Sequence, residues 1–316
     1  MRRFGAWTAL WTFFAVFGFS AFAEFRIVTE KEKIWLEGVS CDELKQQLRD
    51  LALWQASRGE KSPEIPGACV PLEGGRFRVE ASAFLPSKAK AIHGTLPTCA
   101  GPNCFNSAMY LGGLTPYLRH ADDNEFMAAV MASNCQGVEP ADAKPGDLMF
   151  LSAQDANGPG DGMHAYVYLN EQMCFSKNGA GQTKPYLLQT FEGEFNKTYP
   201  VPPECRSWQP APTCKVALVG FRCEGDPIKD FAKLSPEQKK LATDLGAAEC
   251  ALKQPLALAP EQFRDLSRQL SALTQRVSQS GVESKPIQML LLARLLSLQV
   301  QLEEVNPVLN RVAPKL

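Results

Sequence analysis

The sequence has few histidines, almost no net charge and no long apolar run beyond its first residues. Three histidines occur in 316 residues, and the formal net charge is −1. A chain without an excess of basic residues lacks the positive charge that is typical of proteins that bind nucleic acid or anionic membranes. After residue 23 no stretch holds enough uninterrupted apolar residues to cross a bilayer. We therefore expect no nucleic-acid partner and no membrane span in the mature chain.

The first 23 residues have the features of a signal peptide. Arg2 and Arg3 precede an apolar stretch that runs to about Ser20, and Ala-Phe-Ala at 21–23 is a small-residue cleavage site. An uncleaved membrane anchor is the alternative. The small residues at the cleavage site and the polar chain after it favour cleavage near Ala23. We expect the mature protein to be exported to the periplasm or the exterior.

Ten cysteines in an exported chain predict disulfide bonds. They are Cys41, Cys69, Cys99, Cys104, Cys135, Cys174, Cys205, Cys214, Cys223 and Cys250. The even count is compatible with five bridges. If Cys104 is instead a free nucleophile, a second cysteine must also stay free, and Cys174 in the apolar stretch "MCFS" is our candidate. Cys205, Cys214 and Cys223 lie in a proline-rich stretch and are expected mostly to be bridged.

The mature chain divides into four parts by composition and periodicity, and the pattern predicts an α+β fold. Residues 24–90 form an N-terminal segment, with a hairpin and a helix capped by Ser40. Residues 91–200 hold the motifs that carry chemistry, and residues 201–225 are a proline- and cysteine-rich linker. Residues 226–316 repeat apolar side chains every three or four positions, which predicts a small antiparallel helical bundle. Core packing explains this pattern best, and a protein partner or self-association through these helices is the alternative.

The stretch "TCAGPNCFNSAMYLGG" at 98–113 places Cys104 where a helix is expected to begin. Gly-Pro-Asn precedes the cysteine, and Gly112 and Gly113 are expected to end the helix. A helix N-terminus adds positive potential at the sulfur. A cysteine nucleophile also needs an imidazole, which lowers the pKa of the thiol and later protonates the leaving amine. Cys104 is therefore either half of a disulfide or a nucleophile.

His164 is the best imidazole partner for Cys104. It begins the strand "HAYVYL", in which Tyr166 and Tyr168 share its face. The glycine-rich "NGPGDGM" precedes it, so the ring can face a cleft. His93, in a loop before the cysteine, is a candidate for lining that cleft, whereas His120 is expected on the surface.

The order and spacing of these motifs resemble the NlpC/P60 cell-wall peptidases of the papain-like superfamily. Members typically show Asp-Cys-Ser-Gly before a helix, then Pro-Gly-Asp-Leu-x-Phe, then His-Val-Gly-Ile-Tyr-Leu. The matches here are Cys104, then Pro-Gly-Asp-Leu-Met-Phe at 145–150, then His164, Tyr168 and Leu169. The resemblance covers about residues 95–190.

This resemblance implies a papain-like domain in which Cys104 attacks an amide bond in a peptidoglycan stem peptide, without a metal or a cofactor. Two departures concern how a substrate would be positioned. Asn103 replaces the aspartate before the cysteine, and Phe105-Asn106 replaces Ser-Gly. We take Asn103 and His93 as candidate substrate-binding residues.

The residue that orients the imidazole is the least determined part of the site. The family usually has a histidine twelve positions after the first one, with Asn or Gln tolerated, and this chain has Ser176 there. Asn178 lies on the same face if the strand continues, and its carbonyl can accept a hydrogen bond from the His164 ring. We choose Asn178 as the third catalytic residue. The alternatives are Ser176, an orienting group elsewhere such as Gln189, and a turn role for Asn178-Gly179.

Three functions are compatible with these motifs. The first is an exported cysteine peptidase that uses Cys104, His164 and Asn178. The second is a catalytically silent, disulfide-stapled protein that binds cell wall or a partner through the same cleft. The third is an amidase or acyl-transfer enzyme that uses the same pair. A disulfide at Cys104 would exclude both enzymes.

Overall fold

The computed structural model describes residues 25–97, 102–116, 118–155, 158–179, 181–191, 196, 198–223, 234–252, 260–280 and 285–312. The predicted signal peptide lies outside these residues. No helix in the described part of the chain is both long and apolar enough to cross a membrane. Helices and antiparallel sheets are both present, which confirms the predicted α+β class.

The N-terminal segment forms a four-stranded sheet and one long helix. The sheet has the order β1-β2-β4-β3, with β1 at Arg26–Glu30, β2 at Lys33–Gly38, β3 at Val70–Leu72 and β4 at Arg76–Glu80. Helix α1 covers Cys41–Ser57, and its cap Ser40 accepts a hydrogen bond from the Glu43 N–H, as predicted. Trp54 of α1 is buried against Phe175 of the central sheet, so this segment shares a core with the part that carries the motifs.

The central sheet has six antiparallel strands in the order β5-β10-β6-β7-β8-β9. Their bounds are Gln136–Val138 for β5, Leu148–Asp155 for β6, Gly158–Tyr168 for β7, Met173–Lys177 for β8, Tyr186–Thr190 for β9 and Val216–Arg222 for β10. The prediction that His164 begins a strand is wrong, because β7 begins at Gly158 and the glycine-rich residues before His164 belong to it. Strand β10 lies between β5 and β6, so the stretch expected to be a linker supplies a strand to this sheet.

Helices α2 (Ser87–Ile92), α3 (Cys104–Gly112) and α4 (Asp123–Ala132) lie before the central sheet in sequence. Helices α3 and α4 pack against β7, and Phe126 of α4 stacks on Phe150 of β6. Helix α3 ends at Gly112 and is capped by Gly113, whose φ of 79° is in the left-handed region that favours glycine, so the helix ends where it was predicted to end. Short 3₁₀ helices are η1 (Glu73–Gly75), η2 (Ser82–Phe84), η3 (Pro140–Asp142) and η4 (Pro203–Cys205).

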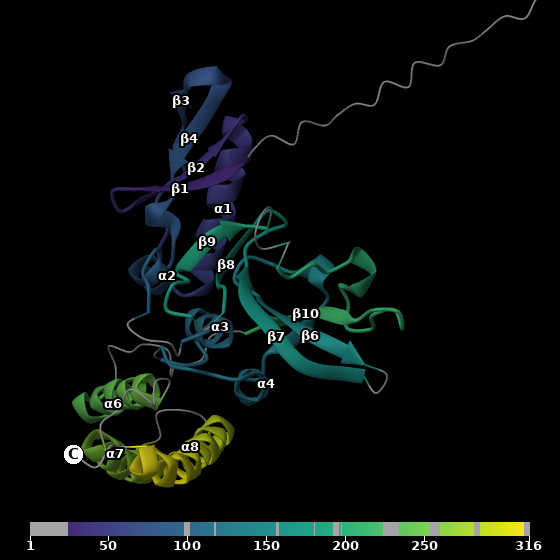
Figure 1. The fold of residues 1–316 in the computed structure, drawn as a ribbon. Helices are drawn as coiled ribbons and strands as arrows, with labels where there is room; N and C mark the ends of the chain where they lie inside the picture. Colours follow the sequence, from purple (N-terminus) through teal and green to yellow (C-terminus); the bar gives the residue numbers. More distant parts are fainter. Residues whose placement is uncertain are drawn as a thin grey trace, which may run out of the picture.

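The C-terminal region is helical, with α6 at Pro236–Leu252, α7 at Pro260–Ser280 and α8 at Lys285–Val312. These helices bury an apolar cluster of their own, which includes Leu245, Leu270 and Leu295 and follows the predicted periodicity. Figure 1 shows the helices at the opposite end of the molecule from the N-terminal sheet, next to α4. Arg294 of α8 donates to buried Glu125 of α4, so the bundle is tied to the centre of the protein by a charged contact.

Three disulfides are present among the described residues, which confirms the disulfide prediction. They join Cys41 to Cys69, Cys135 to Cys223, and Cys205 to Cys214. Cys104 and Cys174 are free and buried, as the nucleophile hypothesis required. Cys99 lies outside the described residues, as does the side chain of Cys250.

Candidate active site

Cys104 is the first residue of α3, and the residues on either side of it form the capped start of the helix. Asn103 is the helix cap, and its Oδ1 accepts a hydrogen bond from the Asn106 N–H at 3.1 Å. The Nδ2 of Asn103 donates to the Ala121 carbonyl. Both ends of this buried carboxamide are therefore engaged within the fold, so Asn103 fixes the position of Cys104. Its expected role in substrate binding stays a prediction.

The environment of the Cys104 sulfur combines strong burial with several donors. Burial raises the pKa of the thiol. Hydrogen bonds from the backbone N–H groups of Ala165, Phe105 and Cys104 itself, and the positive charge of Lys177, act in the opposite direction. The sulfur thus lies at the start of α3 and contacts the backbone of β7. Its partner there, Ala165, directly follows His164 in the chain.

A bulge in β7 positions His164. Leu151 of β6 pairs with His164, and Ser152 pairs with Gly162, so Met163 is an extra residue in β7. Such bulges re-aim neighbouring side chains and are frequent beside active sites. The backbone before the bulge is held by α4, because the Gly162 N–H donates to Asp123 Oδ2 at 2.7 Å.

The His164 imidazole is completely buried and held between polar and aromatic neighbours. Its Nε2 lies 2.9 Å from the Ser176 hydroxyl, and its ring stacks on Tyr199 with a centroid distance of 4.0 Å. Burial lowers the pKa of His164 to about 3, so the ring is neutral at pH 7. Helix α3, which begins at Cys104, packs against β7, the strand that carries His164. That the two side chains face each other within hydrogen-bond reach stays a prediction.

Ser176, rather than Asn178, contacts the imidazole directly. The Ser176 hydroxyl donates to Asn178 Oδ1 at 3.3 Å, and Asn178 and Gln189 exchange hydrogen bonds at 3.3 Å. Because the single hydroxyl proton goes to Asn178, the Ser176 oxygen accepts from His164 Nε2–H. The neutral ring then has its lone pair on Nδ1. The expected orienting residue, Asn178, lies one hydrogen bond further from the ring, and Gln189 lies beyond it.

Lys177, a buried cation near Cys104, was not predicted from the sequence. Its Nζ donates to the carbonyls of Gly179 and Gly181 at 2.6 Å and 3.0 Å, and it has no carboxylate partner among the described residues. Burial lowers the pKa of Lys177 to about 8, and the charge of Cys104 opposes that shift. The alternation of β8 was an available signal, because Lys177 shares a face with buried Phe175.

His93 lies at the edge of β9 and is half-buried. It forms a bridge with Tyr186, and its ring packs edge-on against Phe175 at a centroid distance of 6.1 Å. Burial lowers the pKa of His93 to about 4. Its described contacts are thus with the sheet, and its expected role in substrate binding stays a prediction. His120, expected on the surface, is partly buried, and its carbonyl accepts from Arg119 and Arg294.

Asp147, in the turn before β6, serves the fold. Its carboxylate accepts from the Lys144 N–H at 2.7 Å and pairs with Arg222 of β10 at 2.7 Å. The carboxylate thus satisfies a backbone donor in the turn and pairs with a charged residue of the neighbouring strand β10. Among the described residues, no group of three or more His, Cys, Asp or Glu side chains could hold a metal ion.

In chemical terms the arrangement offers a free thiol at a helix start, a neutral imidazole with a fixed orientation, and backbone donors around the sulfur. These are the parts that nucleophilic attack on a carbonyl carbon requires. No protein-family model, no curated protein and no solved structure matches this chain. The geometry of the site must therefore support any functional assignment without help from a relative.

Proposed function

We propose that this protein is an exported cysteine hydrolase that cleaves an amide bond. One observation carries the proposal. The free thiol of Cys104 lies at the start of α3, near the backbone N–H of Ala165, the residue that follows His164, while the Ser176 hydroxyl hydrogen-bonds to the His164 ring. The thiol and the imidazole are thus both buried and lie on α3 and β7, two elements that pack against each other.

The first step is proton transfer coupled to attack. Burial raises the pKa of Cys104 and lowers that of His164, so both groups are neutral at rest. The Nδ1 lone pair of His164 takes the thiol proton as the sulfur attacks the carbonyl carbon of the substrate. The Lys177 cation stabilises the negative charge on the sulfur during this transfer.

The second step is collapse of the tetrahedral intermediate. Its oxyanion is stabilised by backbone N–H groups at the start of α3, where the Cys104 and Phe105 donors lie near the sulfur. The His164 imidazolium gives its proton to the leaving amine, and a thioester with Cys104 remains. Water then attacks the thioester, with His164 again as the base, and releases the carboxylic acid and the free thiol.

The substrate class comes from the resemblance to the NlpC/P60 peptidases. The match at Cys104, at 145–150 and at His164 supports a peptide stem of bacterial cell wall as the substrate. Export through the predicted signal peptide would bring the enzyme to that polymer. The three disulfides support a compartment that is oxidising.

A catalytically silent binding protein is the second candidate, and one observation favours it. His164 is fully buried, and the Tyr199 ring is stacked on its imidazole. A substrate carbonyl reaches the sulfur only if the surroundings of this pair open. A protein that has lost catalysis would tolerate such a closed site.

The test is cleavage of purified peptidoglycan by the mature chain, with its disulfides intact, followed by mass analysis of the products. We expect new stem-peptide termini with the wild type and none with Cys104→Ala. Cys174→Ala is the matched control, because Cys174 is also a free, buried cysteine but lies inside strand β8 and not at a helix start. Equal cleavage by all three proteins would overturn the role of Cys104. No cleavage by wild type, together with wall binding by wild type and Cys104→Ala alike, would support the silent binding protein.

A further inference from the structure

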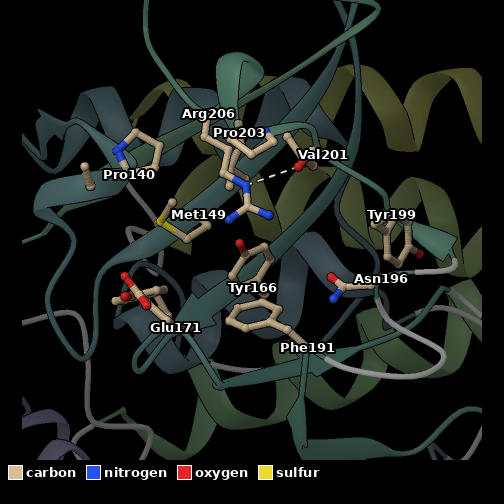
Figure 2. Close-up of a pocket in the computed structure, with 13 residues that line it drawn as sticks. Pro140, Met149, Tyr166, Glu171, Phe191, Asn196, Tyr199, Val201, Pro203 and Arg206 are labelled. Carbon is tan, nitrogen blue, oxygen red and sulfur yellow. Dashed lines mark hydrogen bonds between the residues drawn. The ribbon is translucent and has the colours of Figure 1, made fainter. Parts of the chain in front are cut away.

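A pocket of about 460 Å³ lies on the face of the central sheet that α3 does not cover. Alternation along β6 and β7 directs Met149 and Tyr166 to this face, and Phe150 and Ala165 to the other. The remaining walls come from the turn after β7 and from the segments after β9; they include Glu171, Phe191, Tyr199 and Arg206. Figure 2 shows the rings of Tyr166 and Phe191 lying side by side in the pocket.

Arg206 is held in place at one wall of the pocket. The disulfide between Cys205 and Cys214 fixes the preceding residue, and Arg206 Nε donates to the Val201 carbonyl at 3.1 Å. With Nε engaged, the outer nitrogens of the guanidinium extend towards the Tyr166 hydroxyl in Figure 2. No ion pair of the described residues involves Arg206. A guanidinium fixed in this way is ready to bind a carboxylate through two parallel hydrogen bonds.

Glu171 supplies a negative charge at another wall of the same pocket. It lies in the turn between β7 and β8, and no described cation forms an ion pair with it. Figure 2 shows Met149 and Tyr166 between the Glu171 carboxylate and the Arg206 guanidinium. The pocket therefore presents one cation and one anion that do not neutralise each other, separated by an apolar and aromatic floor.

We propose that this pocket binds a small zwitterion, namely an amino acid or dipeptide with an apolar side chain. Its carboxylate would bind Arg206, its ammonium group would lie towards Glu171, and its side chain would pack on Met149 and Phe191. A simple anion would be repelled by Glu171, and a simple cation by Arg206. The volume of about 460 Å³ is in the usual range for pockets that bind small molecules.

This site is separate from the chemistry of Cys104, but it adjoins the proposed active site. Tyr199 lines the pocket and stacks on His164, so one ring separates a bound ligand from the imidazole. The proposal does not depend on hydrolysis, because binding can be measured in a Cys104→Ala background. Loss of the proposed enzyme activity would leave this binding unaffected.

The experiment is calorimetric titration of the full mature Cys104→Ala chain with the dipeptide leucyl-phenylalanine and with its N-acetylated and C-amidated forms. We expect the unmodified dipeptide to bind most tightly. Amidation removes the carboxylate and should weaken binding about five- to 20-fold, because Arg206 is exposed as well but can form two parallel hydrogen bonds with a carboxylate. Acetylation removes the ammonium group and should weaken binding by about two- to five-fold, because Glu171 is solvent-exposed.

Two variants assign these effects to residues. Arg206→Gln should weaken binding of the unmodified dipeptide as much as amidation of the dipeptide weakens binding to the unsubstituted protein. In this variant, amidation should have no further effect on affinity. Glu171→Gln should weaken binding of the unmodified dipeptide as much as acetylation does, and acetylation should have no further effect in this variant. Arg268→Gln and Glu73→Gln are matched controls, since both residues are exposed and neither lines the pocket. Absence of saturable binding, equal affinity for the three ligands, or an effect of the controls equal to that of the pocket variants would each overturn the proposal.

Discussion

Replacement of Arg294 by methionine tests how the helical bundle is attached to the rest of the protein. Glu125 is completely buried in α4, and its carboxylate accepts from Arg119 and from Arg294 of α8. Removing one partner from a buried ion pair usually costs about 3–5 kcal/mol. Because Glu125 keeps Arg119 and the Arg294 side chain is 14% exposed, we expect a smaller loss of about 2–3 kcal/mol in the free energy of unfolding.

The measurement is urea unfolding of the full chain with its disulfides intact, with a thermal melt beside it. The expected loss corresponds to a fall in Tm of roughly 5–10 °C. Arg268→Met is the control, since the Arg268 side chain is 78% exposed and its pair with Asp265 spans 3.6 Å. The control should change the free energy of unfolding by less than about 0.5 kcal/mol. If Arg294→Met has no larger effect than the control, the bundle is not held by Glu125 and the reasoning fails.

Three further predictions concern the proposed active site. Ser176→Ala should lower kcat about 10- to 100-fold and Asn178→Ala only a few-fold, because the hydrogen bond to the His164 ring comes from Ser176 and Asn178 acts through it. A larger effect of Asn178→Ala in peptidoglycan cleavage would reverse the two roles. His164 has a pKa near 6.5 in the unfolded chain and about 3 in the folded protein. The free energy of unfolding should therefore decrease as the pH is lowered from 6.5 to 3. His164→Gln should flatten this pH dependence in urea melts. Lys177→Met should slow alkylation of Cys104 by iodoacetamide below pH 8, where the lysine is charged; an unchanged rate would show that Lys177 does not stabilise the thiolate.

The start of α3 was predictable because its signals are local. The capping residue Asn103 precedes Cys104, and Gly112 and Gly113 stand at the end of the helix. In β7, the part from His164 onward was recognised from its alternation, but the glycine-rich residues before it, which belong to the same strand, were not. Local signals of this kind locate the elements that carry the two main residues of the candidate site.

Strand β10 was missed because its partners lie far away in the chain. Leu218 pairs with Leu151, and the flanking prolines and cysteines give the stretch the composition of a loop. Strand formation depends on such neighbours more than on the intrinsic preference of the residues. No local pattern reveals that these residues lie between β5 and β6.

The choice between Asn178 and Ser176 depended on where one strand ends. The prediction of Asn178 assumed that the strand continues past Ser176, but β8 ends at Lys177 and Asn178 lies beyond it. The Asn178 side chain therefore meets the Ser176 hydroxyl and Gln189 before it can meet the ring. Ends of strands are set by packing and hydrogen bonding that single sequences specify poorly.

The burial of Cys104 has a consequence for how the chain acquires its covalent structure. Thiol–disulfide exchange proceeds through an accessible thiolate, so its rate falls when a thiol is inaccessible and its pKa is raised. Cys104 and Cys174 are both buried, and burial raises the pKa of both thiols. Once the sheet and α3 have assembled, neither thiol competes with the cysteines that must pair. The same packing that closes the candidate site thus keeps its sulfur reduced while neighbouring cysteines are oxidised.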